Sequence, residues 1–435
     1  MPLSSEINSW PYATTGANAA PLLPVRGWQI ALALAALVLA FVPLVPPVDA
    51  LEGGMTSRGF IEFGLILTSL ALLAIYLKLQ GGFSFDVKSP AFLVITAYCW
   101  WCMISAIWSP NPILSVAKGA ELWCIALAAL MAVTLALRSN FSEGKLAAVF
   151  ALAMIAVIGG LLVANVFYWG RPFPSTGDSA LASELLGESF SEDRPRLILA
   201  YQHALLTADL LALATISLVA SDLRKIFKAI LLPGLLALLW LTDARGAAIG
   251  LATSLLALAL LRLGRNSTRA IAVMSSLSVA VAGLLVFQDR LPDLVRPFMT
   301  DDVLTLNSRT ELWSKTLTHI FAQPILGTGY FASRYLLIKD FDFAGHAHNS
   351  FLEVQLTTGL VGLLMLCAFL VLIAREIFAT RHAWLVGVTL YCVIQGMVNP
   401  IFFTPVLAMF AVTLALTYAG LKKPAAGDSS ERAAQ

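Results

Sequence analysis

The sequence predicts an all-α, polytopic membrane protein with about twelve transmembrane helices. Composition is the first reason: 59% of the residues are hydrophobic, only 12% are charged, and the mean hydropathy is +0.82. A soluble domain carries roughly a quarter charged residues. The second reason is that the apolar residues gather into runs near the length of about 20 that crosses a bilayer. The third is that every second loop between these runs is rich in Lys and Arg, whereas the loops between them hold few.

The apolar runs follow one another almost to the end of the chain. Pro and Gly interrupt several of them, so their ends are defined only to within a few residues. The first run, Trp28 to Val45, is longer than the apolar region of a signal peptide, and we expect it to remain as a membrane anchor. The expected spans lie near residues 28–45, 60–79, 91–108, 119–137, 146–169, 201–220, 226–242, 246–261, 270–287, 350–374, 384–399 and 402–420.

The charges of the loops predict the orientation of the chain. With the N-terminus in the cytoplasm, the even-numbered loops and the C-terminal tail hold most Lys and Arg residues, so both termini are predicted to be cytoplasmic. Two long hydrophilic segments then fall on the outer side. The predicted regions are a disordered tail at 1–27, helices one to nine at 28–287 with an outer loop at 170–200, a large periplasmic loop between helices nine and ten at 288–349, helices ten to twelve at 350–421, and a tail at 422–435.

The large loop is predicted to be partly helical. In the stretch "NSRTELWSKTLTHIFAQP", Ser308 and Glu311 have the spacing of a capping box. Leu312, Trp313, Leu317, Ile320 and Phe321 then recur on one helical face, and Pro324 ends the pattern. This indicates an amphipathic helix that lies on the membrane surface or on the bundle. A second short helix is expected from about Tyr330 to Ile338.

The stretch "HAHNSFLE" places His348 directly before a membrane helix. Ser350 and Glu353 have capping-box spacing, so the helix is predicted to start at about Ser350. The positive potential at a helix N-terminus favours the neutral imidazole that a general base requires, and the exposed N–H groups there can bind an anion. His348 is therefore a candidate catalytic residue, with His346 beside it. The alternative is a pair of interfacial histidines without a catalytic role.

Several arginines are predicted on the same side of the membrane as His348. Arg245 stands in the turn of "TDARGAAIG", Arg196 precedes the sixth span with His203 nearby, and Arg309 opens the amphipathic helix. A guanidinium binds phosphate through two parallel hydrogen bonds and stays charged. These arginines are candidate phosphate ligands. The alternative is that each pairs with a neighbouring carboxylate, such as that of Asp243, Asp193 or Glu311.

Other chemistries are not indicated. A net charge of +2 without a basic cluster does not favour nucleic-acid binding. All five cysteines stand in apolar runs, so we expect no disulfide framework. Cys99 and Cys102 have zinc-like spacing, but they lack partner ligands and are expected to pack as small apolar side chains. There is no P-loop, Rossmann or HExxH motif, so neither a cofactor nor a metal is expected. Carboxylates within the spans at Glu62, Glu121 and Asp209 keep a secondary transporter as an alternative.

Two blocks of the sequence together resemble a known family. "NSRTELWSKTLTHIFAQPILGTGYF" (307–331) and "HAHNSFLEVQLTTGLVGL" (346–363), with weaker support from "TDARGAAIG" (242–250), are similar to the O-antigen ligase and Wzy-type polysaccharide polymerase superfamily, which includes ExoQ-like exopolysaccharide polymerases. The resemblance implies a membrane glycosyltransferase whose donor is a glycan on undecaprenyl pyrophosphate. The donor is consumed at the outer face of the inner membrane without a metal or nucleotide sugar.

The resemblance also implies roles for single residues. His348, followed by Asn349, matches the loop histidine thought to activate the acceptor hydroxyl, and Arg245 and Arg196 match arginines that hold the pyrophosphate. Arg309 matches the arginine before a Trp-containing helix. We assign supporting roles to Asn349, His346, His203 and Glu353.

The predicted function is a polymerase that transfers lipid-linked repeats with inversion of the anomeric carbon. Ligases tend to carry Gly-x-x-Thr after the histidine, whereas here Gly359 is followed by Leu360, Val361 and Gly362, which favours a polymerase. A ligase that transfers glycan to a lipid or protein acceptor, a twelve-helix transporter and a non-catalytic scaffold remain alternatives. The expected partners are the lipid-linked glycan, membrane lipid, a flippase and a chain-length regulator, and no nucleic acid.

Overall fold

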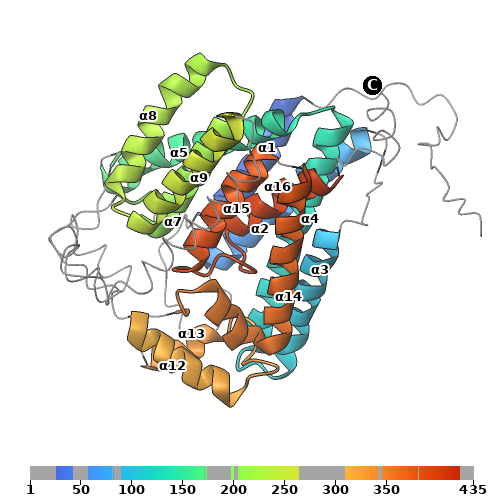
Figure 1. The fold of residues 1–435 in the computed structure, drawn as a ribbon, viewed down its shortest axis with the longest axis vertical. Helices are drawn as coiled ribbons and strands as arrows, with labels where there is room; N and C mark the ends of the chain where they lie inside the picture. The colour runs from blue at the N-terminus through green and yellow to red at the C-terminus, as the bar shows by residue number, and fades with distance from the viewer. Residues whose placement is uncertain are drawn as a thin grey trace, which may run out of the picture.

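The computed structural model describes residues 26–42, 57–80, 82, 90–170, 172–173, 197–199, 204–263, 309–340, 345–380 and 382–421. These residues form an all-helical structure (Figure 1). The helices are α1 (Gly27–Ala40), α2 (Ser57–Leu79), α3 (Pro90–Ile104), the 3₁₀ turn η1 (Ser105–Ile107), α4 (Pro112–Arg138), α5 (Glu143–Trp169), α7 (Ala204–Ala220), α8 (Lys225–Leu241), α9 (Arg245–Leu263), α12 (Arg309–Ala322), α13 (Ser333–Asp340), α14 (Ser350–Thr380), α15 (Ala383–Gly396) and α16 (Leu407–Leu421).

The helices confirm that the fold is all-α. In the described part of the chain, 5 helices are long and apolar enough to cross a membrane: α2, α3 with η1, α4, α5 and α14. The remaining apolar helices α1, α7, α9, α15 and α16 are shorter and also coincide with predicted spans. The ninth predicted span, near 270–287, lies outside the described residues. A count of twelve spans therefore stays a prediction.

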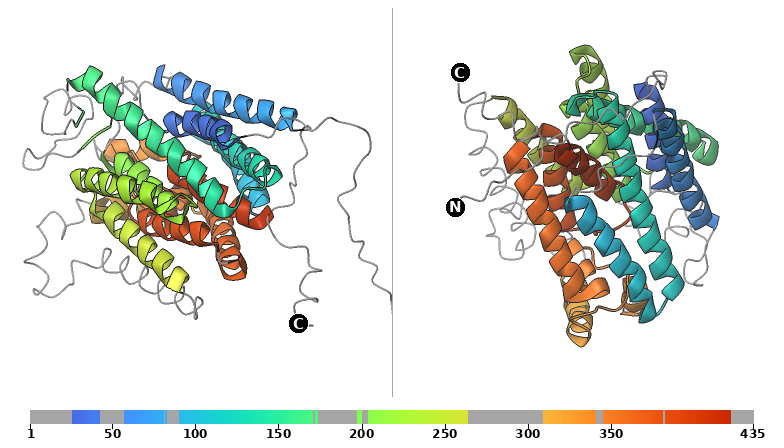
Figure 2. Two further views of the ribbon diagram at one scale, coloured as in Figure 1. Left: turned by 90° about the horizontal axis from the view of Figure 1, so that it is seen from above. Right: turned by 90° about the vertical axis from the view of Figure 1, so that its right-hand side faces the viewer.

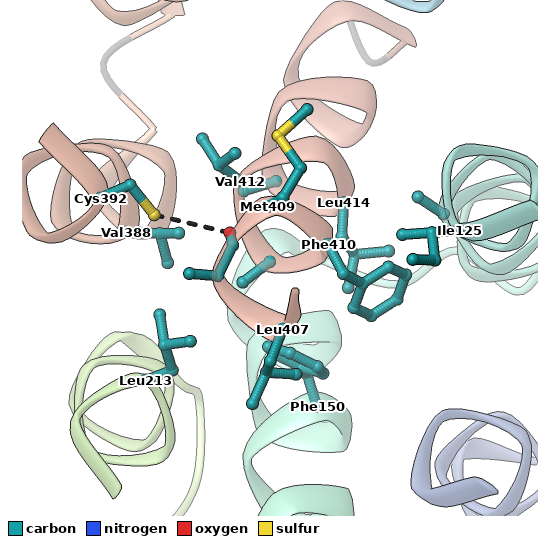
Figure 3. Packing of buried hydrophobic residues seen from close by; sticks show 14 of the residues in the cluster. Ile125, Phe150, Leu213, Val388, Cys392, Leu407, Met409, Phe410, Val412 and Leu414 are labelled. Atoms are coloured by element: carbon teal, nitrogen blue, oxygen red, sulfur yellow. Dashed lines mark hydrogen bonds between the residues drawn. The ribbon is translucent and has the colours of Figure 1, made fainter. Parts of the chain in front are cut away.

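The core is centred on α16, whose residues are buried on all sides. A helix that is apolar all round belongs in the interior of a bundle. Figure 3 shows Phe410 of α16 between Ile125 of α4 and Phe150 of α5, with Phe410 and Phe150 ring centroids 5.7 Å apart. On the other side of α16, the thiol of Cys392 in α15 donates to the carbonyl of Ala408 at 3.5 Å. Cys99 and Cys102 are likewise buried in this core, as expected for packing residues.

The helices α12 and α13 lie together at one end of the bundle, beside the N-terminal end of α14 (Figures 1 and 2). The amphipathic helix predicted in the large loop is thus confirmed as α12. The second helix begins at Ser333 and not near Tyr330, because Phe331 has a left-handed φ of 64° that no helix accepts. A separate apolar cluster joins these elements: Leu312, Ile320, Leu337, Ala347 and Leu356.

Helix α14 is interrupted at Gly359, which has φ 67° and ψ −165°. The turn after α12 fills the interruption and takes up the hydrogen bonds that the helix loses. Thr328 N–H donates to the carbonyl of Leu356 at 2.9 Å, and Gly329 N–H donates to that of Thr357 at 2.9 Å. The N–H of Leu360 donates to the carbonyl of Pro324 at 2.9 Å. A short first segment of α14 is therefore built together with the outer helices, and the long span follows the break.

Glycine is required where these backbones meet. A Cβ on Gly359 would lie 2.2 Å from the carbonyl oxygen of Ile325, and one on Gly327 would lie 2.5 Å from the nitrogen of Gly359. The turn is further fixed by Tyr330, whose hydroxyl donates to the carbonyl of Phe403 at 2.8 Å. Burial raises the pKa of Tyr330 well above its usual range, so the phenol remains a donor.

Candidate functional site

The candidate catalytic histidine lies in a tight loop before α14. His348 has a left-handed φ of 49°, and its N–H donates to Nδ1 of His346 at 3.3 Å. The two imidazole rings have centroids 4.1 Å apart. A left-handed conformation is unfavourable for a residue other than glycine and persists only where the surroundings impose it. Such imposed conformations cluster at functional sites, which supports a functional role for this loop.

The residue between the two histidines is fixed from two directions. The N–H of Ala347 donates to Oε2 of Glu353 at 2.8 Å, and its carbonyl accepts from the indole N–H of Trp313 in α12 at 2.9 Å. The other oxygen of Glu353 accepts from the hydroxyl of Ser333, at the start of α13, at 2.6 Å. Ala347 and Glu353 are both buried. Helices α12, α13 and α14 thus hold the loop jointly, and this arrangement imposes the geometry of His348.

Helix α14 starts at Ser350, as the sequence predicts, but its N-cap residue is not the predicted one. The side-chain oxygen of Asn349 accepts from the N–H groups of Phe351 at 2.9 Å and Leu352 at 3.2 Å, so Asn349 is the N-cap. The predicted capping box of Ser350 and Glu353 is wrong, because Glu353 binds Ala347 and Ser333. The amides of residues 351 and 352 are occupied by the cap, so they are not open to an anion. A phosphate at this site would depend on side-chain cations.

Ser350 has a long-range role in place of a capping role. Its hydroxyl donates to the carbonyl of Asn399 at 3.0 Å and accepts from the N–H of Ile401 at 2.8 Å. The side-chain N–H of Asn349 reaches the same segment and donates to the carbonyl of Met397 at 3.1 Å. The base of the histidine loop is therefore attached to the turn that follows α15.

The same turn lies against the helix that carries Arg245. Arg245 is the first residue of α9 and is exposed to solvent. A Cβ on the adjoining Gly246 would lie 3.5 Å from Val398 and 3.7 Å from the side-chain amide of Gln395. Gln395 in turn accepts from the side-chain N–H of Asn399 at 3.1 Å. The start of α9 and the start of α14 are thus connected through a single short segment, residues 395–402, so Arg245 and His348 lie at the same end of the bundle.

The alternative of a local ion pair for Arg245 is not supported. Asp243 and Arg245 are both described, and they do not form an ion pair. Asp243 has a left-handed φ of 48° in the turn before α9. The hydroxyl of Thr242 accepts from the N–H of Ala244 at 3.3 Å and so stabilises this turn. The turn sets where α9 begins and therefore where Arg245 is presented.

The remaining predicted residues are described only in part. Arg309 is the first residue of α12, four positions before Trp313. The side chain of Arg309 lies outside the described residues, as do Arg196 and His203. The structure therefore brings His346, His348, Asn349 and Glu353 together directly and connects Arg245 to them through residues 395–402.

Four residues hold the candidate site in addition to those that the sequence predicts: Trp313, Ser333, Gln395 and Asn399. The sequence predicts Trp313 only as part of the apolar face of α12, and its indole N–H gives no indication of the partner 34 residues later. Ser333 begins α13, whereas the sequence predicts that this helix starts near Tyr330. Gln395 and Asn399, four residues apart inside an apolar stretch, were a usable signal, because buried amides need hydrogen-bond partners.

The carboxylates on which the transporter alternative depends have partners in the structure. Asp209 in α7 accepts a hydrogen bond from the hydroxyl of Tyr391 in α15. Glu121 accepts from the ammonium of Lys118 at 2.6 Å, and Glu62 lies 3.7 Å from the same group. Ion pairs and hydrogen bonds of this kind are the usual way of accommodating polar groups within a bundle.

One comparison with known proteins covers the region that contains this site. Residues 229–367 match the family model described as O-antigen ligase. A search of curated proteins found no match. The matched region runs from α8 into α14 and contains Arg245, Arg309, Trp313, His348 and Glu353. The match supports the resemblance of this helical membrane protein to the O-antigen ligase and Wzy-type polymerase superfamily.

Proposed function

We propose that the protein is a multi-pass inner-membrane glycosyltransferase that polymerises glycan repeats carried on undecaprenyl pyrophosphate, acting at the periplasmic face with both termini in the cytoplasm. One observation carries this proposal: the His348 loop is clamped by Trp313 and Glu353 at the same end of the bundle as Arg245, within the region that matches the O-antigen ligase family model. A held imidazole and an exposed guanidinium at one end of the bundle could serve as the general base and as the cation that stabilises a departing pyrophosphate.

The proposed reaction is a direct displacement. His348 takes the proton from a hydroxyl of the acceptor sugar as that oxygen forms a bond to the anomeric carbon of the donor. The bond between the anomeric carbon and the pyrophosphate oxygen breaks, and the electron pair leaves with undecaprenyl pyrophosphate. Arg245, together with Arg196 and Arg309, stabilises the negative charge that grows on this leaving group. Attack opposite the leaving group inverts the anomeric carbon, and no metal or cofactor takes part.

The test is replacement of the proposed base. His348→Ala should lower the rate of polymer formation by about 10²- to 10⁴-fold, the usual contribution of general base catalysis. The rate is measured with purified protein in lipid vesicles that contain the lipid-linked repeat. His319→Ala, a histidine of the same outer region on α12, is the control and should retain activity. If His348→Ala were correctly folded and made polymer at the normal rate, the assignment of His348 as the base would be wrong.

A ligase is the second candidate, and the description of the matching family favours it. Both reactions use the same donor and the same chemistry, so they differ only in the acceptor. The product decides between them. Lengthening repeats that remain on undecaprenyl pyrophosphate indicate a polymerase, whereas transfer of the glycan to another lipid or to a protein indicates a ligase.

A further inference from the structure

Helix α12 has three faces. One faces the rest of the protein, one is polar and exposed, and the third is apolar and exposed. Leu312, Thr316 and Ile320 are buried and face the rest of the protein. Glu311, Ser314, Lys315 and Thr318 form an exposed polar face. Between these faces, Leu317 is 41% exposed and Phe321 is 77% exposed. At i and i+4 the two side chains lie together on the helix surface.

The turn after α12 extends this apolar surface. Ile325 is 62% exposed and Leu326 is 46% exposed. We call Leu317, Phe321, Ile325 and Leu326 the outer patch. Single exposed apolar side chains are common, but a contiguous group indicates a contact surface.

The outer patch is continuous with the membrane-facing surface of α14. The N–H of Leu360 donates to the carbonyl of Pro324 at 2.9 Å, and the N–H of Val361 donates to that of Ile325 at 3.5 Å, so the turn lies directly against α14. Beyond this point, exposed apolar residues recur every seven positions along the span, at Leu364, Val371 and Phe378. A row of exposed apolar side chains on a membrane-spanning helix contacts acyl chains. The outer patch prolongs that row.

Several backbone groups of the turn are paired within the protein, which favours the same environment. Irregular backbone cannot lie at membrane depth unless its N–H and C=O groups are paired within the protein. The amide of Gly327 donates to the carbonyl of Gln323 at 3.2 Å, and that of Thr328 donates to the carbonyl of Leu356 at 2.9 Å. The carbonyl of Pro324 accepts both from Leu360 N–H and, at 3.0 Å, from the side-chain amide of Gln355. These groups of the turn are therefore already paired within the protein and need no water.

We propose that the outer patch inserts into the acyl-chain region of the membrane leaflet nearest α12, so that the end of α12 and the following turn are a lipid-docking surface and not part of an aqueous loop. The occupant is phospholipid acyl chains. Because Trp313 in the same helix binds Ala347, insertion of the patch holds the His346–His348 loop close to the headgroup layer. The docking does not depend on the catalytic assignment of His348.

The experiment places a polarity-sensitive nitrobenzoxadiazole label on the outer patch of the full chain. Cys367 is exposed and is first replaced by Ser, and the protein with this change alone gives the background of labelling. Phe321→Cys reports on the patch, and Thr318→Cys, three residues away on the polar face, is the matched control. Each labelled protein is placed as one copy per nanodisc of phosphatidylethanolamine and phosphatidylglycerol.

The label at position 321 should be quenched several-fold more strongly by doxyl-labelled phospholipid than the label at 318, and several-fold less strongly by aqueous iodide. Ile325→Cys is the second reporter, should Phe321→Cys not fold, and it should behave as position 321 does. Equal iodide quenching at the patch and at 318 would overturn the proposal. Iodide access at one copy per disc that disappears at two copies, or only in native membranes, would also overturn it, because a second chain or another protein would then be the occupant.

Discussion

Replacement of Glu353 tests whether the clamp on the histidine loop works through hydrogen bonds or through charge. Glu353→Ala removes two acceptors, so the buried N–H of Ala347 loses its partner and the hydroxyl of Ser333 keeps only a long contact, 3.5 Å, to the carbonyl of Gly345. An unsatisfied buried donor costs about 1–3 kcal/mol and a weakened hydrogen bond about 1 kcal/mol, so the loss of stability should be roughly 2–4 kcal/mol. Release of the loop would also move His348, and a displacement of about 1 Å at a catalytic group costs on the order of 10²-fold in rate.

Glu353→Gln should be far milder. The amide oxygen of glutamine accepts from Ala347 N–H, and its NH₂ group donates to the hydroxyl of Ser333, which accepts as well as it donates. The hydroxyl then turns its own proton towards the carbonyl of Gly345, now 3.5 Å away. We therefore expect a stability change of about 1 kcal/mol or less and a rate within roughly tenfold of the unchanged protein.

The assays are thermal unfolding in detergent and polymer formation in vesicles, each applied to both variants. If Glu353→Gln were as stable as the unchanged protein but as inactive as Glu353→Ala, the negative charge of Glu353 would be needed for the reaction. The reasoning from positioning would then be wrong. If both variants kept full activity, the clamp would not control His348 at all.

Three further predictions follow from the same geometry. Trp313→Phe keeps the ring but removes the donor to Ala347, so polymer formation should fall about tenfold, with a loss of about 1–3 kcal/mol in unfolding free energy. Gly359→Ala should cost at least about 1–3 kcal/mol by thermal unfolding from backbone strain, whereas Gly160→Ala, where an added Cβ meets nothing within 4 Å, should not destabilise the protein. Arg245→Lys should leave stability unchanged, since the side chain is exposed, but should lower kcat/KM for the lipid-linked repeat by about tenfold, because lysine cannot form the bidentate contact. An unchanged kcat/KM would remove Arg245 from the site.

The positions of the helices are predicted well from the sequence, whereas the contacts between them are predicted poorly. Apolar runs and the positions of Pro and Gly located α2, α4, α5 and α14 to within several residues, because hydrophobic length is a local property. The pattern of α12 was also local, and Pro324 ended that helix as expected. The interruption at Gly359 could not be predicted in this way, because it depends on backbone hydrogen bonds from a turn some 30 residues earlier in the chain.

The misassigned cap shows the same limit at a single residue. Asn349 and Ser350 are both good N-cap residues, and local spacing to Glu353 favoured Ser350. The structure gives the cap to Asn349, because Ser350 is engaged by the carbonyl of Asn399 and the N–H of Ile401. Tertiary contacts decided between two residues that local rules rank as equal.

The predicted topology brings the candidate site residues to one side of the membrane, but it does not predict how firmly the histidine loop is held. Charge alternation placed His348 and Arg245 on one side of the membrane, and the structure connects them at one end of the bundle through residues 395–402. What no local pattern indicated is that Ala347 is held by both α12 and α14. Because these two attachments share one loop, their contributions should not be additive. Once Glu353→Ala has released the loop, Trp313→Phe should cost little more, whereas two independent supports would give losses that sum. A structural role for Trp313 apart from the loop would produce that sum, so the double variant distinguishes a shared clamp from two separate contacts.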